Sequence, residues 1–303
     1  MREVAAGRWI KTRNEPASGA TTDGVPIQAA HRSPDPATLT TSVLLAIDIG
    51  NTNVKLGTFV GPELTATWRL ETDSVRMPDE YAVVLDWLLQ RRGFSFDDLS
   101  GISMSSTVPA MVPIFKELAG NYLPKTAPFI EVKATANTGV TIAIDNPYEM
   151  GPDRIVDALA AINLYRVPAI IIDFGTATTF DAIDADGRLL GMALAPGLRT
   201  AMDGLFQRAA RLSRIELEPP HDVIGRNTVA ALRSGWVYGY VGLVEGLVTR
   251  MKAELGPETL VIATGGLADY VLSETRVVDV HDPTLTLKGL RLYFERNAPC
   301  PTP

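Results

Sequence analysis

The sequence predicts an α/β fold that is built from two similar lobes. Two short apolar runs, Val43–Ile47 and Ala169–Ile172, have the composition of buried strands. Each run ends in a turn of the pattern Asp-X-Gly-polar, which starts at Asp48 in the first case and at Asp173 in the second. The two turns lie 125 positions apart (173 − 48), a spacing that favours duplication of a lobe over a short-period repeat array.

The first lobe is predicted at residues 43–166 and opens with a β-meander. Its apolar residues recur with the periods of strands and of amphipathic helices. We expect strands at Val43–Ile47, Val54–Phe59, Leu64–Leu70 and Gly101–Ser106, and helices at Asp79–Arg92, Val112–Leu123 and Arg154–Tyr165.

The second lobe is predicted at residues 167–297. A third apolar run, Leu260–Ala263, ends in Thr264-Gly265-Gly266, and a long helix is expected at Thr228–Leu255. Glycine in a helix costs about 1 kcal/mol of stability relative to alanine. Where several glycines share one face of a helix, we therefore expect a helix of this lobe or a second subunit to pack closely against that face. Four glycines of the long helix are spaced 4, 3 and 4 apart on one face: Gly235, Gly239, Gly242 and Gly246.

Length and composition indicate a globular protein with a sizeable core. At about 150 residues per domain, the 303 residues fit two domains. The chain contains 46% hydrophobic and 21% charged residues, and a disordered chain would have fewer hydrophobic and more charged residues. Residues 1–42 are the exception, since they are rich in Ala, Thr, Pro and Gly without any period, and we interpret them as a disordered extension. Residues 298–303 form a tail.

Charge and cysteine content narrow the classes of partner. The 28 basic and 35 acidic residues give a net charge of −7, the opposite balance from a binder of nucleic-acid backbones. The single cysteine, Cys300, cannot form a disulfide within the chain. The longest uncharged stretch, Leu99–Phe115, is interrupted by prolines and polar residues and is too short for a membrane span. We therefore expect a cytoplasmic protein with neither a nucleic-acid nor a membrane partner.

The first turn, Asp48 to Asn53, has the residues of a phosphate-binding loop. Gly50 permits a close approach to the backbone, and Asn51, Thr52 and Asn53 add small polar side chains around its N–H groups. The Asp48 carboxylate would repel a phosphate unless a cation intervened, which implies Mg²⁺ held partly through water. Lys55 lies just beyond the turn and can neutralise phosphate charge. A polar β-turn without a ligand is the alternative.

The second turn, Asp173 to Thr179, offers three threonine hydroxyls, and the third strand ends in Gly265-Gly266, where bare backbone could lie against an adenine ring. Three such strand ends in one chain are hard to explain by accident. Together they resemble the superfamily of acetate kinase, sugar kinases, heat-shock chaperone ATPases and actin. That resemblance implies two ribonuclease-H-like lobes with a nucleotide cleft between them.

Within that superfamily, the ordered motifs resemble those of type III pantothenate kinases over about Val43 to Asn297. The resemblance implies ATP-dependent phosphorylation of the primary hydroxyl of pantothenate, the first step toward coenzyme A, and a homodimer. The motifs are Asp48–Asn53, Asn146-Pro147, Gly151–Arg154, Asp173–Thr179, Pro196-Gly197 and Gly225–Thr228.

The family's roles transfer onto matching positions as follows. Asp153 resembles the general base, and Arg154, with Gly151 and Pro152, belongs to the substrate-contacting motif. Asp173 resembles the ligand of a monovalent cation, K⁺ or NH₄⁺. Thr176 resembles an ATP contact and Thr228 a contact to the pantothenate end.

The residue chemistry supports Asp153 independently, because an attacking alcohol must lose its proton and a carboxylate within reach accelerates this by about 10²- to 10⁴-fold. The alternative is that Asp153 only caps a helix. Arg154 could bind a carboxylate bidentately or pair with Asp157 across the first helical turn.

Two positions depart from the family pattern. Proline replaces the usual alanine at Pro152, which a first helical position tolerates. Ile144 stands where the family often has a substrate-contacting tyrosine, and Tyr148 could supply that contact instead. The three histidines are far apart and are not expected to be catalytic. Asp181 and Asp184 are expected to lie on a solvated hairpin.

Two other functions remain open at this stage. One is a nucleotide-binding regulator without strong catalysis, which intact Asp153 and phosphate loops argue against. The other is a kinase for another small hydroxyl compound, which Ile144 makes conceivable and which a substrate panel would distinguish.

Overall fold

The computed structural model describes residues 42–209, 215–216 and 218–299. Residues 1–41 of the predicted extension and residues 300–303 of the predicted tail lie outside this description. Among the described helices, none has the length and apolar content to cross a membrane.

The first sheet has five strands in the order β3-β2-β1-β4-β5. The three opening strands are antiparallel neighbours, while β1, β4 and β5 run parallel. Their bounds are β1 Val43–Ile49, β2 Asn53–Val60, β3 Glu63–Glu71, β4 Leu99–Ser106 and β5 Phe129–Glu131.

The second sheet repeats this order and adds one strand, giving β11-β10-β7-β8-β9-β6. Again three consecutive strands, β7, β8 and β9, are antiparallel neighbours, while β7 pairs in parallel with β10 and β10 pairs in parallel with β11. The bounds are β6 Thr141–Ile142, β7 Ala169–Phe174, β8 Ala177–Ile183, β9 Arg188–Pro196, β10 Leu260–Thr264 and β11 Val280–His281. The predicted two-lobed α/β fold is confirmed, and β1 and β7 occupy equivalent positions within it.

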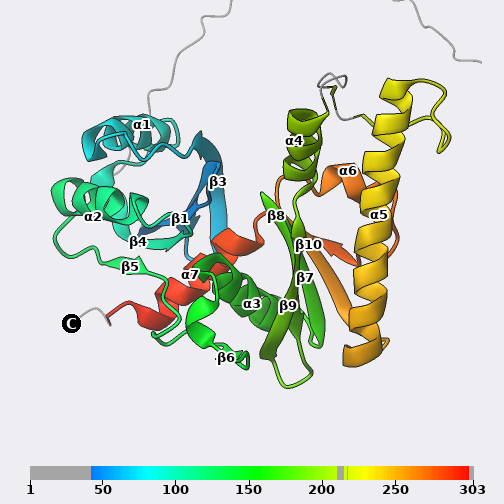
Figure 1. Cartoon of the computed structure of the whole chain (residues 1–303). Coiled ribbons are helices and arrows are strands. Elements are labelled where there is room, and N and C mark those ends of the chain that lie inside the picture. Colours follow the sequence, from blue (N-terminus) through cyan, green and yellow to red (C-terminus); the bar gives the residue numbers. More distant parts are fainter. Residues whose placement is uncertain (1–41, 210–214, 217, 300–303) are drawn as a thin grey trace, which may run out of the picture. The chain divides into compact units, whose positions relative to one another are not determined.

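Helices cover the sheets on both sides (Figure 1). Helices α1 and α2 pack on one face of the first sheet, and α4, α5 and α6 pack on one face of the second. The predicted helices all form, with ends within two residues of those expected. The helices are α1 Pro78–Gln90, α2 Met111–Tyr122, α3 Pro152–Leu164, α4 Leu198–Arg208, α5 Thr228–Leu255, α6 Asp269–Leu272 and α7 Leu285–Asn297, with single 3₁₀ turns at Phe96–Asp98 and Pro147–Glu149.

Helices α3 and α7 pack against each other and share a core with both sheets. Leu44 and Ala46 of β1 face this core, whereas Val43 and Leu45 face α1 and α2, as strand alternation requires. The helix pair is close, since a Cβ on Gly289 of α7 would collide with the α3 backbone. The N-terminus of α3 is thereby fixed beside the ends of β1 and β7.

Two elements pair outside the predicted lobe to which they belong in sequence. Strand β6, from the predicted first lobe, pairs with β9 of the second sheet. Helix α7, from the predicted second lobe, contacts β1, β2 and β4 of the first sheet. The boundaries 43–166 and 167–297 stay a prediction.

The glycine face of α5 has no close neighbour among the described residues. A Cβ on Gly235, Gly239 or Gly242 would meet nothing within 4 Å, and on Gly246 it would meet only an arginine of the same helix. The expected packing of a helix of this lobe against the face is therefore absent from the described part of the chain. A second subunit and an exposed glycine face are the two alternatives that remain.

Candidate active site

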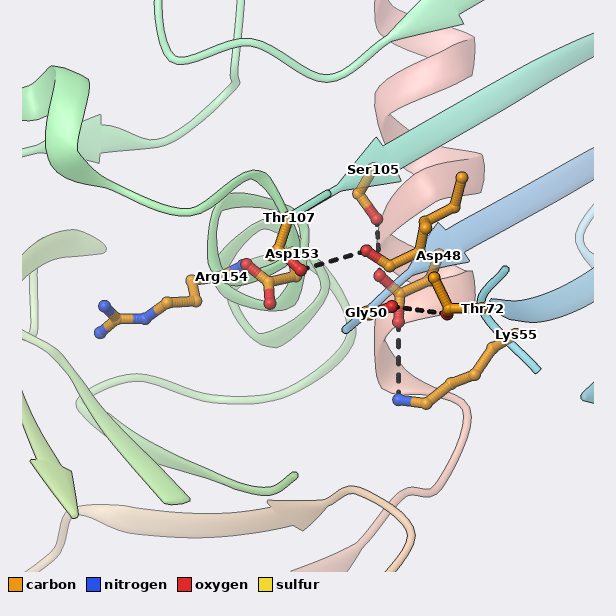
Figure 2. Close-up of polar contacts among 9 residues, drawn as sticks. Asp48, Gly50, Lys55, Thr72, Ser105, Thr107, Asp153 and Arg154 are labelled. Carbon is orange, nitrogen blue, oxygen red and sulfur yellow. Dashed lines mark hydrogen bonds and ion pairs between the residues drawn. The ribbon is translucent and has the colours of Figure 1, made fainter. Parts of the chain in front are cut away.

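The first turn is a cradle held by its own backbone and by two threonines (Figure 2). Gly50 N–H donates to the Asn53 carbonyl at 2.9 Å and closes the turn. The Thr72 hydroxyl donates to the Gly50 carbonyl at 2.7 Å, and Thr107 donates to the Ile49 carbonyl through its backbone N–H at 2.9 Å. Asn51 and Thr52 at the turn are exposed. The loop is thus fixed while its tip stays open to a ligand.

Asp48 at the end of β1 is buried and fully engaged. Its Oδ1 accepts a hydrogen bond from Ser105 at 2.8 Å, and its Oδ2 lies 3.5 Å from Lys55 Nζ. Asp48 and Lys55 are direct partners in the β1–β2 pairing. Burial acts to lower the pKa of Lys55, but the carboxylates of Asp48, Asp173 and Asp157 outweigh burial and raise it, so this lysine is a charged group at neutral pH.

The second turn repeats the first at the end of β7. Gly175 N–H donates to the Ala177 carbonyl at 3.0 Å, and the Thr176 carbonyl accepts from Gly197 N–H at 3.0 Å and from the Thr200 hydroxyl at 2.6 Å. A Cβ on Gly197 would lie 2.4 Å from the Thr176 oxygen, so only glycine fits there. The Thr52 and Thr176 hydroxyls lie 3.3 Å apart, which brings together the two turns predicted from sequence.

The third predicted element, Gly265-Gly266, lies directly beside the second turn. Gly265 has φ +94°, and a Cβ there would lie 2.4 Å from Oδ1 of Asp173. A Cβ on Gly266 would lie 3.2 Å from Nη1 and Nη2 of Arg69, which belongs to β3. The glycine pair therefore contacts the second turn on one side and the first sheet on the other.

Asp153 lies in the first turn of α3 and near Asp48 (Figure 2), and the carboxylates of both Asp48 and Asp173 act on it electrostatically. Its Oδ1 accepts a hydrogen bond from Arg154 N–H at 2.9 Å, and a Cβ on Gly151 would lie 2.6 Å from that oxygen. Burial, together with the negative charges of Asp48 and Asp173, raises the pKa of Asp153 from 3.8 to about 7. A carboxyl group with that pKa can accept and release a proton near neutral pH.

Arg154 does not pair with Asp157, one of the two options left by sequence. Its side chain points away from Asp48 and Lys55 (Figure 2) and forms a salt bridge with Asp181 of β8, with a further contact to Met192. The prediction that Asp181 lies on a solvated hairpin is wrong, because its side chain is buried. Asp184 does lie on the β8–β9 hairpin, where it binds Arg188 at 2.7 Å. Arg154 is thus held in place from the second sheet.

Several buried oxygens near Asp153 have no hydrogen-bond partner. They belong to Asp157 (Oδ1), Asp173 (Oδ1) and Thr264 (Oγ1). Asp173 and Thr264 are direct partners in the β7–β10 pairing. Burial raises the pKa of Asp173 and raises that of Asp157 well above 3.8. Buried unpartnered carboxylate oxygen suits a hard cation, although the described residues hold no group of three or more His, Cys, Asp or Glu side chains placed to bind one.

The predicted pantothenate contacts are only partly brought together. Gly151, Pro152, Asp153 and Arg154 form the start of α3, whereas Thr228 is the first residue of α5. Asn227 caps α5 by accepting from Ala230 N–H at 2.9 Å. Among the described residues, no hydrogen bond or ion pair joins Gly225–Thr228 to Asp153. That segment instead borders a cavity of about 490 Å³, lined by Ile224, Arg226, Arg233 and the 219–222 segment among others.

The two departures from the family pattern differ in exposure. Ile144 packs against the shared core, and Tyr148 is 76% exposed. Tyr148 is therefore accessible to a ligand, while Ile144 contributes to packing.

Sequence reasoning missed three charged residues of this site. Asp157 follows Asp153 by one helical turn, a spacing that could have been noticed. Arg69 is the cross-strand partner of Lys55, but register is visible only once the strands are aligned. Asp181 alternates with buried apolar residues of β8, yet its partner Arg154 lies 27 positions away, and no local pattern reveals such a pair.

Comparisons with known proteins show the family to which the chain belongs. The family profile described as type III pantothenate kinase matches residues 44–250. The chain is 46% identical over 255 residues to the type III pantothenate kinase of Moorella thermoacetica and 48% identical over 257 residues to that of Acidothermus cellulolyticus. These matches cover 84% and 85% of this chain and the whole of each relative.

Among solved structures, a conserved Campylobacter jejuni protein described as a member of the Baf transcriptional activator family superposes with a TM-score of 0.54. At 18% identity, over 84% of this chain and 98% of that one, this likeness concerns the fold alone. The profile and the two relatives carry the assignment: the chain belongs to the type III pantothenate kinase family.

Proposed function

We propose that this chain transfers the γ-phosphoryl group of ATP to the primary hydroxyl of pantothenate, with Asp153 as the general base. Family membership gives the reaction, which is the first step toward coenzyme A. The observation that carries the residue assignment is the position of Asp153 between two glycine turns, with a pKa raised by burial to about 7.

In the proposed step, the pantothenate hydroxyl oxygen attacks the γ-phosphorus. A new O–P bond forms, the bond from the γ-phosphorus to the β,γ-bridging oxygen breaks, and ADP leaves. The hydroxyl proton passes to the Asp153 carboxylate. Most of the rate enhancement in such transfers comes from positioning and charge neutralisation, which Lys55 and the backbone N–H groups of both turns supply.

Divalent and monovalent cations fit the residues present. Asp48 would hold Mg²⁺ through water, because both its oxygens already have partners in Ser105 and Lys55. Asp173 would hold K⁺ or NH₄⁺ through its unpartnered Oδ1. When bound, these cations neutralise charge on the phosphate chain and on the buried carboxylates.

A homodimer is part of the proposal, because the glycine face of α5 has no neighbour among the described residues. Small residues along one side of a helix let a second helix approach closely, and two-fold dimers are the commonest assemblies of soluble proteins.

The single cysteine of the sequence fits the reducing cytoplasm where coenzyme A is made.

The test is pantothenate-dependent ADP release with Mg²⁺-ATP, with phosphopantothenate identified by mass, in wild type, Asp153→Asn and the exposed control Asp186→Asn. We expect turnover in wild type and Asp186→Asn, and a fall of about 10²- to 10⁴-fold in Asp153→Asn. Turnover that persists in Asp153→Asn would remove Asp153 as the base. ATP binding without pantothenate-dependent turnover would favour a regulator, and turnover with another hydroxyl compound would favour a different kinase.

A further inference from the structure

Arg69 of β3 is a charged side chain that the proposed chemistry does not use. It lies opposite Lys55 in the antiparallel β2–β3 pairing, so both side chains extend from the same face of the first sheet. Like charges directly opposite each other in such a ladder destabilise it. Arg69 lies close enough to Lys55 for the two charges to repel.

The surroundings of the two cations differ. Lys55 has a carboxylate partner, since Asp48 lies 3.5 Å from its Nζ. Arg69 has neither an ion pair nor a hydrogen bond with any residue that the structure describes. Arg154, Arg76 and Arg233 do have such partners, in Asp181, Asp73 and Glu218 respectively. Arg92 and Arg199, like Arg69, have no side-chain ion pair or hydrogen bond with a described residue. The donors of Arg69 are therefore available to an anion.

The exposed guanidinium group of Arg69 lies beside the loop after β10 of the other sheet. A Cβ on Gly266 would lie 3.2 Å from both Nη atoms and 3.5 Å from Cζ, so the guanidinium plane rests over the bare backbone of the loop after β10. Gly265 of that loop in turn contacts Asp173 and Phe174 of the second turn. Arg69 thus bridges the first sheet to the loop that borders the nucleotide-binding turns.

We propose that Arg69 is a nucleotide-binding residue that donates to the phosphate chain of ATP and holds the Gly265-Gly266 loop to the first sheet. A guanidinium group binds phosphate oxygens with two parallel hydrogen bonds, a geometry that lysine cannot reproduce. A bound phosphate chain would also relieve the repulsion between Arg69 and Lys55. This inference rests on the proposed function only in taking ATP as the nucleotide.

The test is direct binding to the full chain by calorimetry, without pantothenate, so that its outcome does not depend on the phosphoryl acceptor. The ligands are Mg²⁺-ATP, Mg²⁺-ADP and adenosine. The variants are Arg69→Gln, Arg69→Lys and the control Arg76→Gln, which removes the same charge from a paired arginine in the next loop. Thermal melting of each variant checks that it folds.

We expect Arg69→Gln to weaken ATP and ADP binding by about 10- to 100-fold, the effect of losing charge-assisted hydrogen bonds. Adenosine binding should weaken far less than ATP and ADP binding, and the melting temperature should not fall. Arg69→Lys should recover part of the loss, and Arg76→Gln should bind like wild type. Unchanged ATP binding in Arg69→Gln would overturn the proposal. An equal loss for adenosine would overturn the phosphate contact.

A double-mutant cycle tests the contact with Gly266. Gly266→Ala should weaken ATP binding in the wild-type background, because the added methyl group displaces the guanidinium, and should have little further effect in Arg69→Gln. Additive effects of the two substitutions would show that the loop and Arg69 act separately and would overturn the bridging role. Failure of the kinase assay with pantothenate would count against the proposed function and leave these binding results intact.

Discussion

The turns that follow β1 and β7 share a backbone design but differ in how their aspartates are satisfied. Each strand has one antiparallel and one parallel neighbour in its sheet, and each glycine N–H closes its turn onto a carbonyl at about 3 Å. Asp48 is neutralised within the protein by Ser105 and Lys55. Asp173 is only half-buried as a residue, but its buried Oδ1 has no partner among the described residues.

The comparison shows that two sheets with the same strand order can surround equivalent carboxylates with different charges. Two β-sheets with the same strand order place two carboxylates at equivalent positions, and the neighbours on adjacent strands decide what each can bind. In the first sheet, Asp48 lies opposite Lys55 of β2. In the second sheet, Asp173 lies opposite Thr179 of β8. This difference supports the proposal that the first turn binds phosphate and that Asp173 of the second holds a cation.

The largest expected effect concerns Asp153, which lies between the two turns. As a base it must be ionised, so kcat/KM of wild type should rise with pH until about 7 and then level off. The Asp153→Asn variant should lose about 10²- to 10⁴-fold in kcat and show no such rise. A pH–rate profile of both proteins checks this, and an unchanged rise in the variant would assign the titration to another group.

The same substitution should stabilise the fold. The pKa of Asp153 is raised by burial from 3.8 to about 7, so the folded state binds more protons than the unfolded state between these values and loses stability as pH increases through this range. Melting of Asp153→Asn should therefore occur above that of wild type at pH 8 and at the same temperature near pH 3. A lower melting temperature at pH 8 would contradict the burial argument.

The comparison between the turns is tested most directly by exchanging each aspartate for asparagine. Asp173→Asn should lose about 10²- to 10³-fold in kcat and should no longer respond to K⁺ or NH₄⁺. Asp48→Asn should lose a similar amount while keeping its response to those ions. Steady-state assays with and without each ion measure this, and a persistent response in Asp173→Asn would place the cation elsewhere.

Glycine substitutions should separate the turns by stability. Gly265→Ala places a methyl group 2.4 Å from Asp173 Oδ1 at φ +94°, a strained position that we expect to cost about 1 to 3 kcal/mol. Gly50→Ala meets only the Asn53 carbonyl at 3.5 Å, an ordinary contact, and should change stability by less than about 1 kcal/mol. Denaturant unfolding of both variants is the measurement, and equal losses would refute the distinction.

The smallest effect is expected at the hydroxyl pair between the turns. Thr52→Val or Thr176→Val removes one exposed hydrogen bond of 3.3 Å, which is worth about 1 kcal/mol or less. The KM for ATP should rise by about fivefold at most. If both variants behave like wild type, the pair does not hold the turns together in solution.

Much of the architecture could be predicted from local pattern. The apolar runs ending in Asp-X-Gly predicted β1 and β7, and the long helical stretch at Thr228–Leu255 predicted α5 with the bounds observed. The pairing of β6 with β9 could not be predicted, because two residues carry too little pattern to specify a partner. The packing of α7 on the first sheet could not be predicted either, since it depends on contacts across most of the chain.

In the candidate site, too, local patterns were predictable and contacts between distant segments were not. The residues supplied by turns were recognisable, since Asp48, Gly50, Asp173 and Gly265 lie at strand ends where their chemistry stands out. Asp181 and Arg69 were missed because each acts through a partner on another element, in a buried ion pair and a strand register respectively. Asp157 lies one helical turn after Asp153 and could have been recognised from that spacing. The distribution of charge in the site is thus a property of the assembled fold.

The position of α7 has a consequence for how the protein is made. This helix supplies Leu287 and Leu290 to the inner face of the first sheet, and its Leu290 carbonyl accepts a hydrogen bond from Ser103 at 2.8 Å. A ribosome therefore completes β1 to β4 long before it synthesises the residues that cover them. Until residues 285–297 emerge, the side of the first sheet that α7 covers is incompletely buried, and such exposed apolar surface favours aggregation during synthesis.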